Sequence, residues 1–152
     1  MSIKEICSRV VVFVRKGESI ADAARLMREH HVGSLVVVEE AAGKRVPAGM
    51  LTDRDIAIGV VALGLDPDKT PVEAAMRADL VAARESDGIG RAVTLMRSQG
   101  VRRVPVVDAA GALVGVLAAD DLMELFAEET AGLAAIIGRG AQRERALRTA
   151  SL

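Results

Sequence analysis

The sequence predicts a mixed α+β fold, in which two tandem β-α-β-β-α units pack about a pseudo-twofold axis and a helical extension follows. Three observations support it. The chain repeats itself, because Leu26-Met27-Arg28 recurs as Leu95-Met96-Arg97 and Gly49 recurs as Gly115. Each copy alternates β-branched runs with stretches of helical periodicity. A unit of about 65 residues buries its sheet poorly alone, so we expect two copies to share a core.

The repeat predicts three parts of the chain. The first unit covers residues 1–65, the second covers residues 66–129, and the C-terminal helical extension covers residues 130–152. Asp66-Pro67-Asp68-Lys69 is the one clear linker between the units.

The first unit begins with a short helical turn at Ile3 and Ile6, where Ser2 and Glu5 are spaced as a capping box. Val10–Val14 predicts a buried strand because it is β-branched and aromatic. Ser19 is a good N-cap for a helix that runs to about His31 and ends at Gly33. The apolar stripe expected on this helix consists of Ile20, Ala23, Ala24 and Met27.

The rest of the first unit is a hairpin followed by a helix. Leu35–Val38 predicts the second buried strand, and a turn around Gly43-Lys44 leads into the third. A helix is expected from Asp53 to a terminating Gly64. The second unit repeats this order, starting with Thr70-Pro71-Val72-Glu73, whose spacing predicts another capping box.

The stretch Gly49–Asp55 is the candidate site of the first unit. Gly49 leaves room for a ligand close to the backbone. Thr52 and Asp55 lie three residues apart, so hydroxyl and carboxylate can face the same side of a helix N-terminus, where a phosphate is favoured. A carboxylate also suits two ribose hydroxyls. The alternative is that both residues only cap the helix.

Composition argues against several functions. The formal net charge is −1 and there is no Trp or Tyr, so neither nucleic-acid nor membrane binding is expected. Cys7 is the only cysteine, and no signal peptide or spanning segment is recognised, which favours a soluble cytoplasmic protein. His30-His31 and Asp120-Asp121 are adjacent pairs that diverge on a helix, so no metal site or acid–base pair is expected. No catalytic constellation is recognised, and we expect no enzyme.

These residues together resemble the CBS domain pair, or Bateman module. The resemblance rests on the tandem repeat, on Val101–Asp108 in the second copy, and on the Gly-hydrophobic-Leu-Thr-x-x-Asp pattern at Gly49–Asp55. It implies a regulatory module that requires no cofactor and binds AMP, ADP, ATP or S-adenosylmethionine in the cleft between the units. It also implies dimerisation.

The resemblance implies a role for each site residue. The hydroxyl of Thr52 would contact phosphate and Asp55 would hold the ribose; the second copy keeps Asp121, but Ala118 replaces the hydroxyl residue. Arg102 and Arg103 occupy the basic positions before the strand proline, although a solvated pair at a helix end is the alternative. Adenine would lie against the first strand of each unit. The expected ligand contacts are Thr52, Asp55, Asp121, Arg102, Arg103, Val11, Val12, Leu80, Val81 and Pro105.

The expected function is therefore a stand-alone sensor that binds an adenosine ligand and acts on an unknown effector protein; the alternative is a structural homodimerisation module without a physiological ligand. An apolar stripe prolongs the last helix, formed by Leu122, Leu125, Phe126, Leu133, Ile136 and Ile137. With the other helices it predicts a homodimer that buries over roughly 1,500 Å². Gly138-Arg139-Gly140 is expected to interrupt this helix, and Gln142–Arg148 is expected to be a frayed, solvated end.

Overall fold

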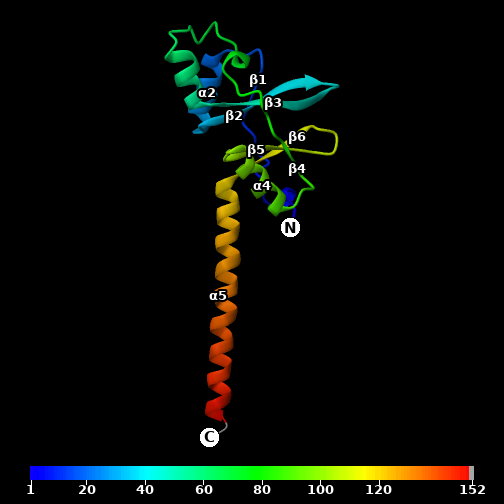
Figure 1. The fold of residues 1–152 in the computed structure, drawn as a ribbon, viewed down its shortest axis with the longest axis vertical. Coiled ribbons are helices and arrows are strands. Elements are labelled where there is room, and N and C mark those ends of the chain that lie inside the picture. The colour runs from blue at the N-terminus through cyan, green and yellow to red at the C-terminus, as the bar shows by residue number, and fades with distance from the viewer. Residues whose placement is uncertain (151–152) are drawn as a thin grey trace. The chain divides into compact units, whose positions relative to one another are not determined.

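The computed structural model describes residues 1–150, which form two compact units (Figure 1). The first unit is Met1–Ala118 and contains both sheets; the second begins at Ala119 and is one helix, α5 (Ala119–Ala150). The mixed fold with two β-α-β-β repeats and a C-terminal helix is as the sequence predicts.

The two repeats have the same topology. In the first, the elements are α1 (Ile3–Ile6), β1 (Phe13–Arg15), α2 (Ile20–His30), β2 (Ser34–Ala41), β3 (Lys44–Thr52), α3 (Asp53–Ile56) and the π-helical turn η1 (Ala57–Val61). In the second, they are the 3-10 turn η2 (Val72–Ala74), β4 (Ala83–Arg84), α4 (Ile89–Gln99), β5 (Arg103–Val107) and β6 (Leu113–Ala118). Each forms a three-stranded sheet whose first pair is parallel and whose second pair is antiparallel.

The central strand of the first sheet is buried, as its β-branched composition predicts. Leu35, Val36, Val37 and Val38 are at most 1% exposed. The core around it takes Ile20, Ala23 and Met27 from α2, but Ala24 is exposed, so the predicted stripe on α2 is narrower than expected. Ser19 caps α2 as predicted, because its hydroxyl oxygen accepts from the Asp22 N–H at 3.1 Å.

The first turn of the chain lies in the second repeat. The N–H groups of Ile3 and Lys4 donate to the carbonyls of Asp87 and Glu85, both at 2.9 Å, and Ile3 is fully buried. The Ser2–Glu5 capping box predicted from the sequence is present, and the bonds from the backbone and hydroxyl of Ser2 hold the pKa of the Glu5 carboxyl below its usual range.

The corresponding turn of the second repeat lies in the first. The Val72 N–H donates to the carbonyl of Glu18 at 2.8 Å, and Val72 is a fully buried member of the first repeat's core. The turn is 3-10 and begins after Pro71, and the capping box predicted at Thr70 is wrong. The Thr70 hydroxyl instead donates to the Asp66 carbonyl at 2.7 Å. The repeats thus exchange their first turns.

Gly49 and Gly115 provide room for these exchanged segments rather than for a ligand. A Cβ at Gly49 would lie 2.6 Å from the carbonyl oxygen of Arg77, and one at Gly115 would lie 2.8 Å from that of Ser8. Met50 pairs with Arg77, and Val116 with Ser8, through reciprocal backbone bonds. The ligand-approach role expected for Gly49 is therefore wrong, because backbone already fills that space.

Several predicted boundaries also shift. The strand expected from Val10 begins only at Phe13, and Val10 is 85% exposed. Helix α2 ends because His31 adopts the left-handed conformation, with φ of 54°, and not because of Gly33. The helix expected after Asp53 passes into a π-helical turn before it ends near Gly64.

Helix α5 continues through residues 138–140, so the expected interruption and the frayed end are wrong for the described part of the chain. An isolated glycine lowers helix propensity by about 1 kcal/mol but does not by itself break a helix. Among residues 1–150, no helix is both long and apolar enough to cross a membrane.

Candidate functional site

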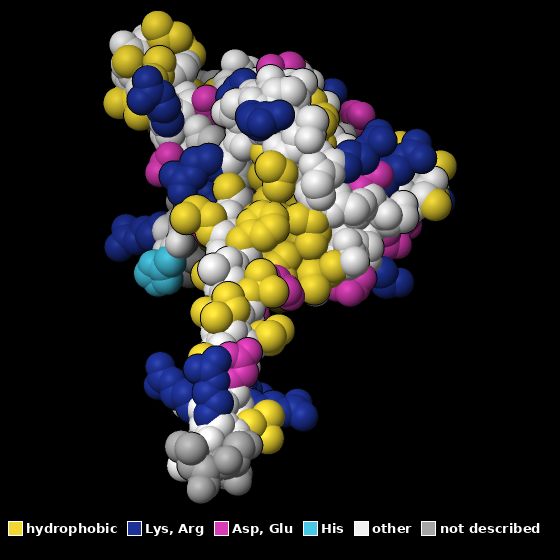
Figure 2. All heavy atoms as spheres, turned by 60° about the horizontal axis from the view of Figure 1, so that its bottom comes forward, with side chains coloured by type: hydrophobic (Ala, Val, Ile, Leu, Met, Phe, Trp, Pro, Cys, Tyr) yellow, Lys and Arg dark blue, Asp and Glu magenta, His cyan; other side chains and the backbone are white. Residues whose placement is uncertain are grey.

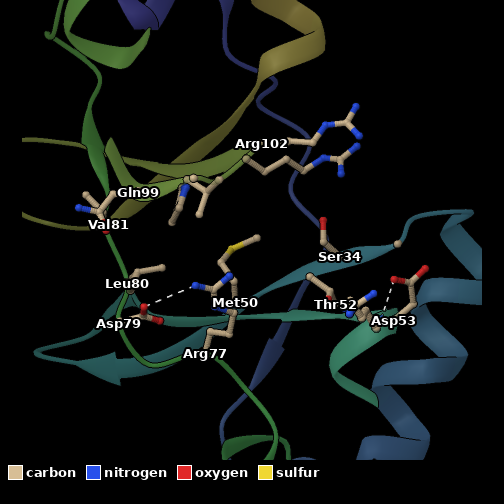
Figure 3. A pocket seen from close by; sticks show the side chains of 16 residues that line it. Ser34, Met50, Thr52, Asp53, Arg77, Asp79, Leu80, Val81, Gln99 and Arg102 are labelled. Carbon is tan, nitrogen blue, oxygen red and sulfur yellow. Dashed lines mark hydrogen bonds and ion pairs between the residues drawn. The ribbon is translucent and has the colours of Figure 1, made fainter. Parts of the chain in front are cut away.

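A pocket of about 520 Å³ lies within the unit Met1–Ala118, between residues of both repeats (Figure 3). Its volume is in the range of small-molecule sites. Four segments form it: the start and end of the first hairpin, the chain before β4, and the α4–β5 connection. The lining residues are Gly33, Ser34, Met50, Thr52, Asp53, Arg54, Arg77, Asp79, Leu80, Val81, Gln99, Gly100, Val101, Arg102, Arg103 and Pro105.

Positive charge prevails in this pocket. Arg54, Arg77, Arg102 and Arg103 line it, against the carboxylates of Asp53 and Asp79. Arg77 and Asp79 pair at 3.5 Å on one side, and Figure 3 shows Thr52 and Asp53 on the other. Guanidinium groups bind carboxylates and phosphates through paired hydrogen bonds. The pocket therefore suits an anionic ligand.

The local chain direction brings Arg102 and Arg103 to the pocket. Helix α4 ends at Gln99, and Gly100 adopts the left-handed conformation with φ of 62°, which turns the chain into β5. Arg103 is the first residue of that strand and both arginines are exposed. Arg102 directly precedes β5, so neither arginine lies in helix α4; whether they contact a ligand stays a prediction. Pro105, two residues further, also lines the pocket, and its contact with a ligand stays a prediction.

Thr52 and Asp55 cap helix α3 reciprocally. The Thr52 hydroxyl oxygen accepts from the Asp55 N–H at 3.1 Å, and the Asp55 carboxylate accepts from the Thr52 N–H at 2.9 Å. The capping interpretation of this pair is confirmed. Thr52 also lines the pocket, whereas Asp55 is half-buried and does not. The ribose role of Asp55 stays a prediction.

Of the other predicted contacts, two line the pocket and three do not. Leu80 and Val81 line the pocket, and their contact with adenine stays a prediction. Val11 and Val12 are half-buried and lie outside its lining. Asp121 lies in the first turn of α5, which belongs to the second unit. The roles expected for these three residues remain predictions.

Sequence reasoning missed several lining residues. Asp53 and Arg54 follow Thr52 directly and could have been found from the position of the motif. Arg77 and Gln99 carry no such signal. Arg77 reaches the pocket because its backbone pairs with Met50, which only the docked structure shows.

The fold and the repeat agree with the comparison to known families. The model of the CBS domain matches residues 3–61 and 72–128. The chain therefore belongs to the CBS domain family and carries two such domains in tandem.

Three relatives illustrate the range of chain lengths. The CBS domain-containing protein YhcV of Bacillus subtilis is 39% identical over 134 residues, which are 88% of this chain and 91% of that protein. The uncharacterized protein MK0525 of Methanopyrus kandleri is 34% identical over 82% of this chain, but the match spans only 62% of that protein. The L-aspartate semialdehyde sulfurtransferase of Methanocaldococcus jannaschii is 29% identical, and there the match spans 23% of the protein.

Of three similar chains with solved structures, two are in complex with adenosine compounds and one is hexameric. The CBS domain protein PAE2072 of Pyrobaculum aerophilum, complexed with AMP, has a TM-score of 0.71 at 29% identity, covering 80% of this chain and 90% of that one. The CBS domain pair of protein MJ0100, in complex with 5′-methylthioadenosine and S-adenosyl-L-methionine, has a TM-score of 0.71 at 25% identity, covering 85% and 98%. The CBS-CP12 protein of bloom-forming cyanobacteria, with a TM-score of 0.69 at 28% identity over 81% and 69%, is hexameric.

Proposed function

We propose that this chain is a regulatory module that binds a phosphorylated adenosine nucleotide, AMP, ADP or ATP, in the pocket between its repeats. The observation that carries the proposal is the set of four arginines lining that pocket beside Thr52. The AMP found in a structure at 29% identity supports the ligand class. Binding would then alter what an effector protein recognises.

The charge of the pocket favours phosphate over a sulfonium ligand. S-adenosylmethionine carries a net positive charge at neutral pH, so four guanidinium groups and only two carboxylates disfavour it. In the proposed pose, Thr52 and the arginines hold the phosphate, and Leu80 and Val81 contact adenine. Asp55 lies outside the lining, and its contact with the ribose is a separate part of the proposal that its own variant tests. In the second repeat, Ala118 occupies the position of Thr52 and lacks its hydroxyl, so a second half-site would be weaker for phosphate.

Calorimetric titration of AMP and adenosine into wild type and variants tests this function. We expect the double substitution Arg102→Gln with Arg103→Gln to lower AMP affinity by about 100-fold or more, because bonds to charged groups contribute roughly 1.5–3 kcal/mol each. Adenosine binding should change little. Arg97→Gln is the matched control, since this exposed arginine of α4 does not line the pocket. Equal effects on AMP and adenosine, or no AMP binding by wild type at millimolar concentration, would contradict the proposal.

A structural homodimerisation module is the second candidate. The exposed apolar side chains of α5 favour it. If none of the adenosine compounds binds and the chain is still dimeric, this second function is the better one.

A further inference from the structure

Helix α5 carries opposite charges at its two ends. Its first twelve residues, 119–130, contain five acidic side chains and no basic one: Asp120, Asp121, Glu124, Glu128 and Glu129. Residues 131–138 contain no charged side chain. The last part contains four arginines and one glutamate: Arg139, Arg143, Arg145, Arg148 and Glu144. Apart from Glu144, this order agrees with the helix dipole, since acidic side chains lie at the N-terminal end and cations at the C-terminal end.

An exposed apolar stripe runs along the same helix. Phe126, Leu133 and Leu147 occupy one position of a seven-residue repeat, with Gly140 between the last two, and they are 50%, 63% and 61% exposed. Ile136 and Ile137 flank Leu133 on the next turn and are 68% and 74% exposed. Figure 2 shows hydrophobic side chains along α5 and a group of basic ones near its C-terminal end. A seven-residue apolar period is typical of a helix that pairs with another helix.

The composition of α5 also indicates that it needs a partner. Gly132, Gly138 and Gly140 lie within the helix, and each costs about 1 kcal/mol relative to alanine. Every described side chain from Phe126 to Thr149 is exposed. Most helices in proteins are stabilised by packing of an apolar face rather than by propensity. A long, glycine-containing helix with an apolar stripe is therefore expected to pack that stripe.

We propose that α5 pairs antiparallel with α5 of a second copy of this chain. Antiparallel pairing places the acidic part of one helix beside the arginine-rich part of the other, at both ends of the pair. Parallel pairing would place acid beside acid and arginine beside arginine, which is unfavourable. In a two-fold symmetric pair every contact occurs twice, so the contact between acidic and basic segments forms at both ends of the pair. This interaction is independent of nucleotide binding.

The apolar stripe and the charges select the same register. The midpoint of the uncharged segment falls between Ala134 and Ala135. A two-fold axis there places Leu133 of one copy opposite Ile136 of the other, and Phe126 opposite Arg143, where a cation–π contact is favourable. The same axis brings Glu129 close to Arg139 of the second copy.

Sedimentation equilibrium of the full chain tests the pairing. We expect a dimer whose dissociation constant rises with salt, because screening weakens the paired charges. Ile136→Glu should raise that constant by at least about 100-fold, since the buried charge occurs twice in a two-fold interface. Leu63→Glu is the matched control: Leu63 is 68% exposed, like Ile136, but lies outside α5. A monomer at tens of micromolar, or a dimer that Leu63→Glu dissociates and Ile136→Glu does not, overturns the proposal.

Spin-label distances decide the orientation. A label at Ala135→Cys should lie close to its mate, because this residue is next to the axis. Labels at Ala146→Cys should be about 35 Å apart, from twice the separation from the axis at 1.5 Å per residue. A parallel pair would give short distances at both positions and would overturn the proposal. Cys7 is buried, and a sample without an added cysteine checks its labelling.

Discussion

At the scale of single residues, Thr52 and Asp55 combine structure with the proposed function. Their reciprocal bonds of 2.9 Å and 3.1 Å satisfy two of the backbone N–H groups at the start of α3. One carboxylate oxygen of Asp55 is used in this cap. Capping does not conflict with ligand binding by the other oxygen, so stability and affinity must be measured separately.

Asp55→Asn separates the two roles. The amide oxygen of asparagine can still accept from the Thr52 N–H, so the free energy of unfolding should fall by less than about 1 kcal/mol. Loss of the charge should lower AMP affinity about 10- to 100-fold, because hydrogen bonds to charged groups contribute roughly 1.5–3 kcal/mol. Urea unfolding and calorimetry measure the two effects. Unfolding at room temperature combined with unchanged affinity would assign Asp55 to the cap alone.

At the scale of elements, the exchanged first turns explain why each sheet needs the other repeat. Helix α1 contributes Ile3, and Ser8 in the chain after it pairs with Val116 of β6. The turn η2 contributes Val72, and Arg77 in the chain after it pairs with Met50 of β3. Positions 49 and 115 have no room for a side chain, because this backbone passes close to Gly49 and Gly115. The exchange therefore couples the two sheets directly.

Ile3→Ala should destabilise the second repeat although the residue is close to the N-terminus. Ile3 is fully buried, and truncation of a buried isoleucine costs about 2–5 kcal/mol. Val10→Ala is the control, because Val10 is 85% exposed and surface changes stay within about 0.5 kcal/mol. In Ile3→Ala, amide hydrogen exchange should show a larger loss of protection at Val116 than at Met50. An equal or smaller loss at Val116 would mean that α1 does not support β6.

At the scale of the whole molecule, the pocket and the exchanged turns connect the two repeats, so we expect the repeats to unfold together. Residues from both repeats line the pocket, and Val72 of the second repeat completes the core of the first. A ligand bound there contacts both repeats and should stabilise both. Independent unfolding of the two repeats is not expected.

Thermal unfolding measures this cooperativity. We expect one transition for the sheets, which AMP, ADP or ATP at 100 times its dissociation constant raises by about 5–10 °C, from roughly 2.7 kcal/mol of binding free energy. Circular dichroism follows the transition, and amide exchange at Val37 and Val106 reports each central strand. Two separate transitions, or a shift confined to one strand, would show that the repeats are not coupled in this way.

The sequence by itself determined the features that depend on local patterns. The duplication, the buried central strand at Leu35–Val38 and the caps at Ser2 and Ser19 all follow from residue spacing. The resemblance brought Thr52, Arg102 and Arg103 forward, and all three line the pocket. These features need only the period of side chains along a helix or strand and the hydrogen-bonding capacity of a nearby side chain.

The tertiary structure alone decided which distant segments meet. It placed Ile3 beside Asp87 and Val72 beside Glu18, and it brought Arg77 into the pocket. It also filled the space beside Gly49 with backbone, where the sequence had predicted a ligand. Such contacts depend on how surfaces fit after the sheets have formed. The side-chain period of a first turn is the same whether it packs in its own repeat or in the other one. The local pattern therefore cannot distinguish these two arrangements.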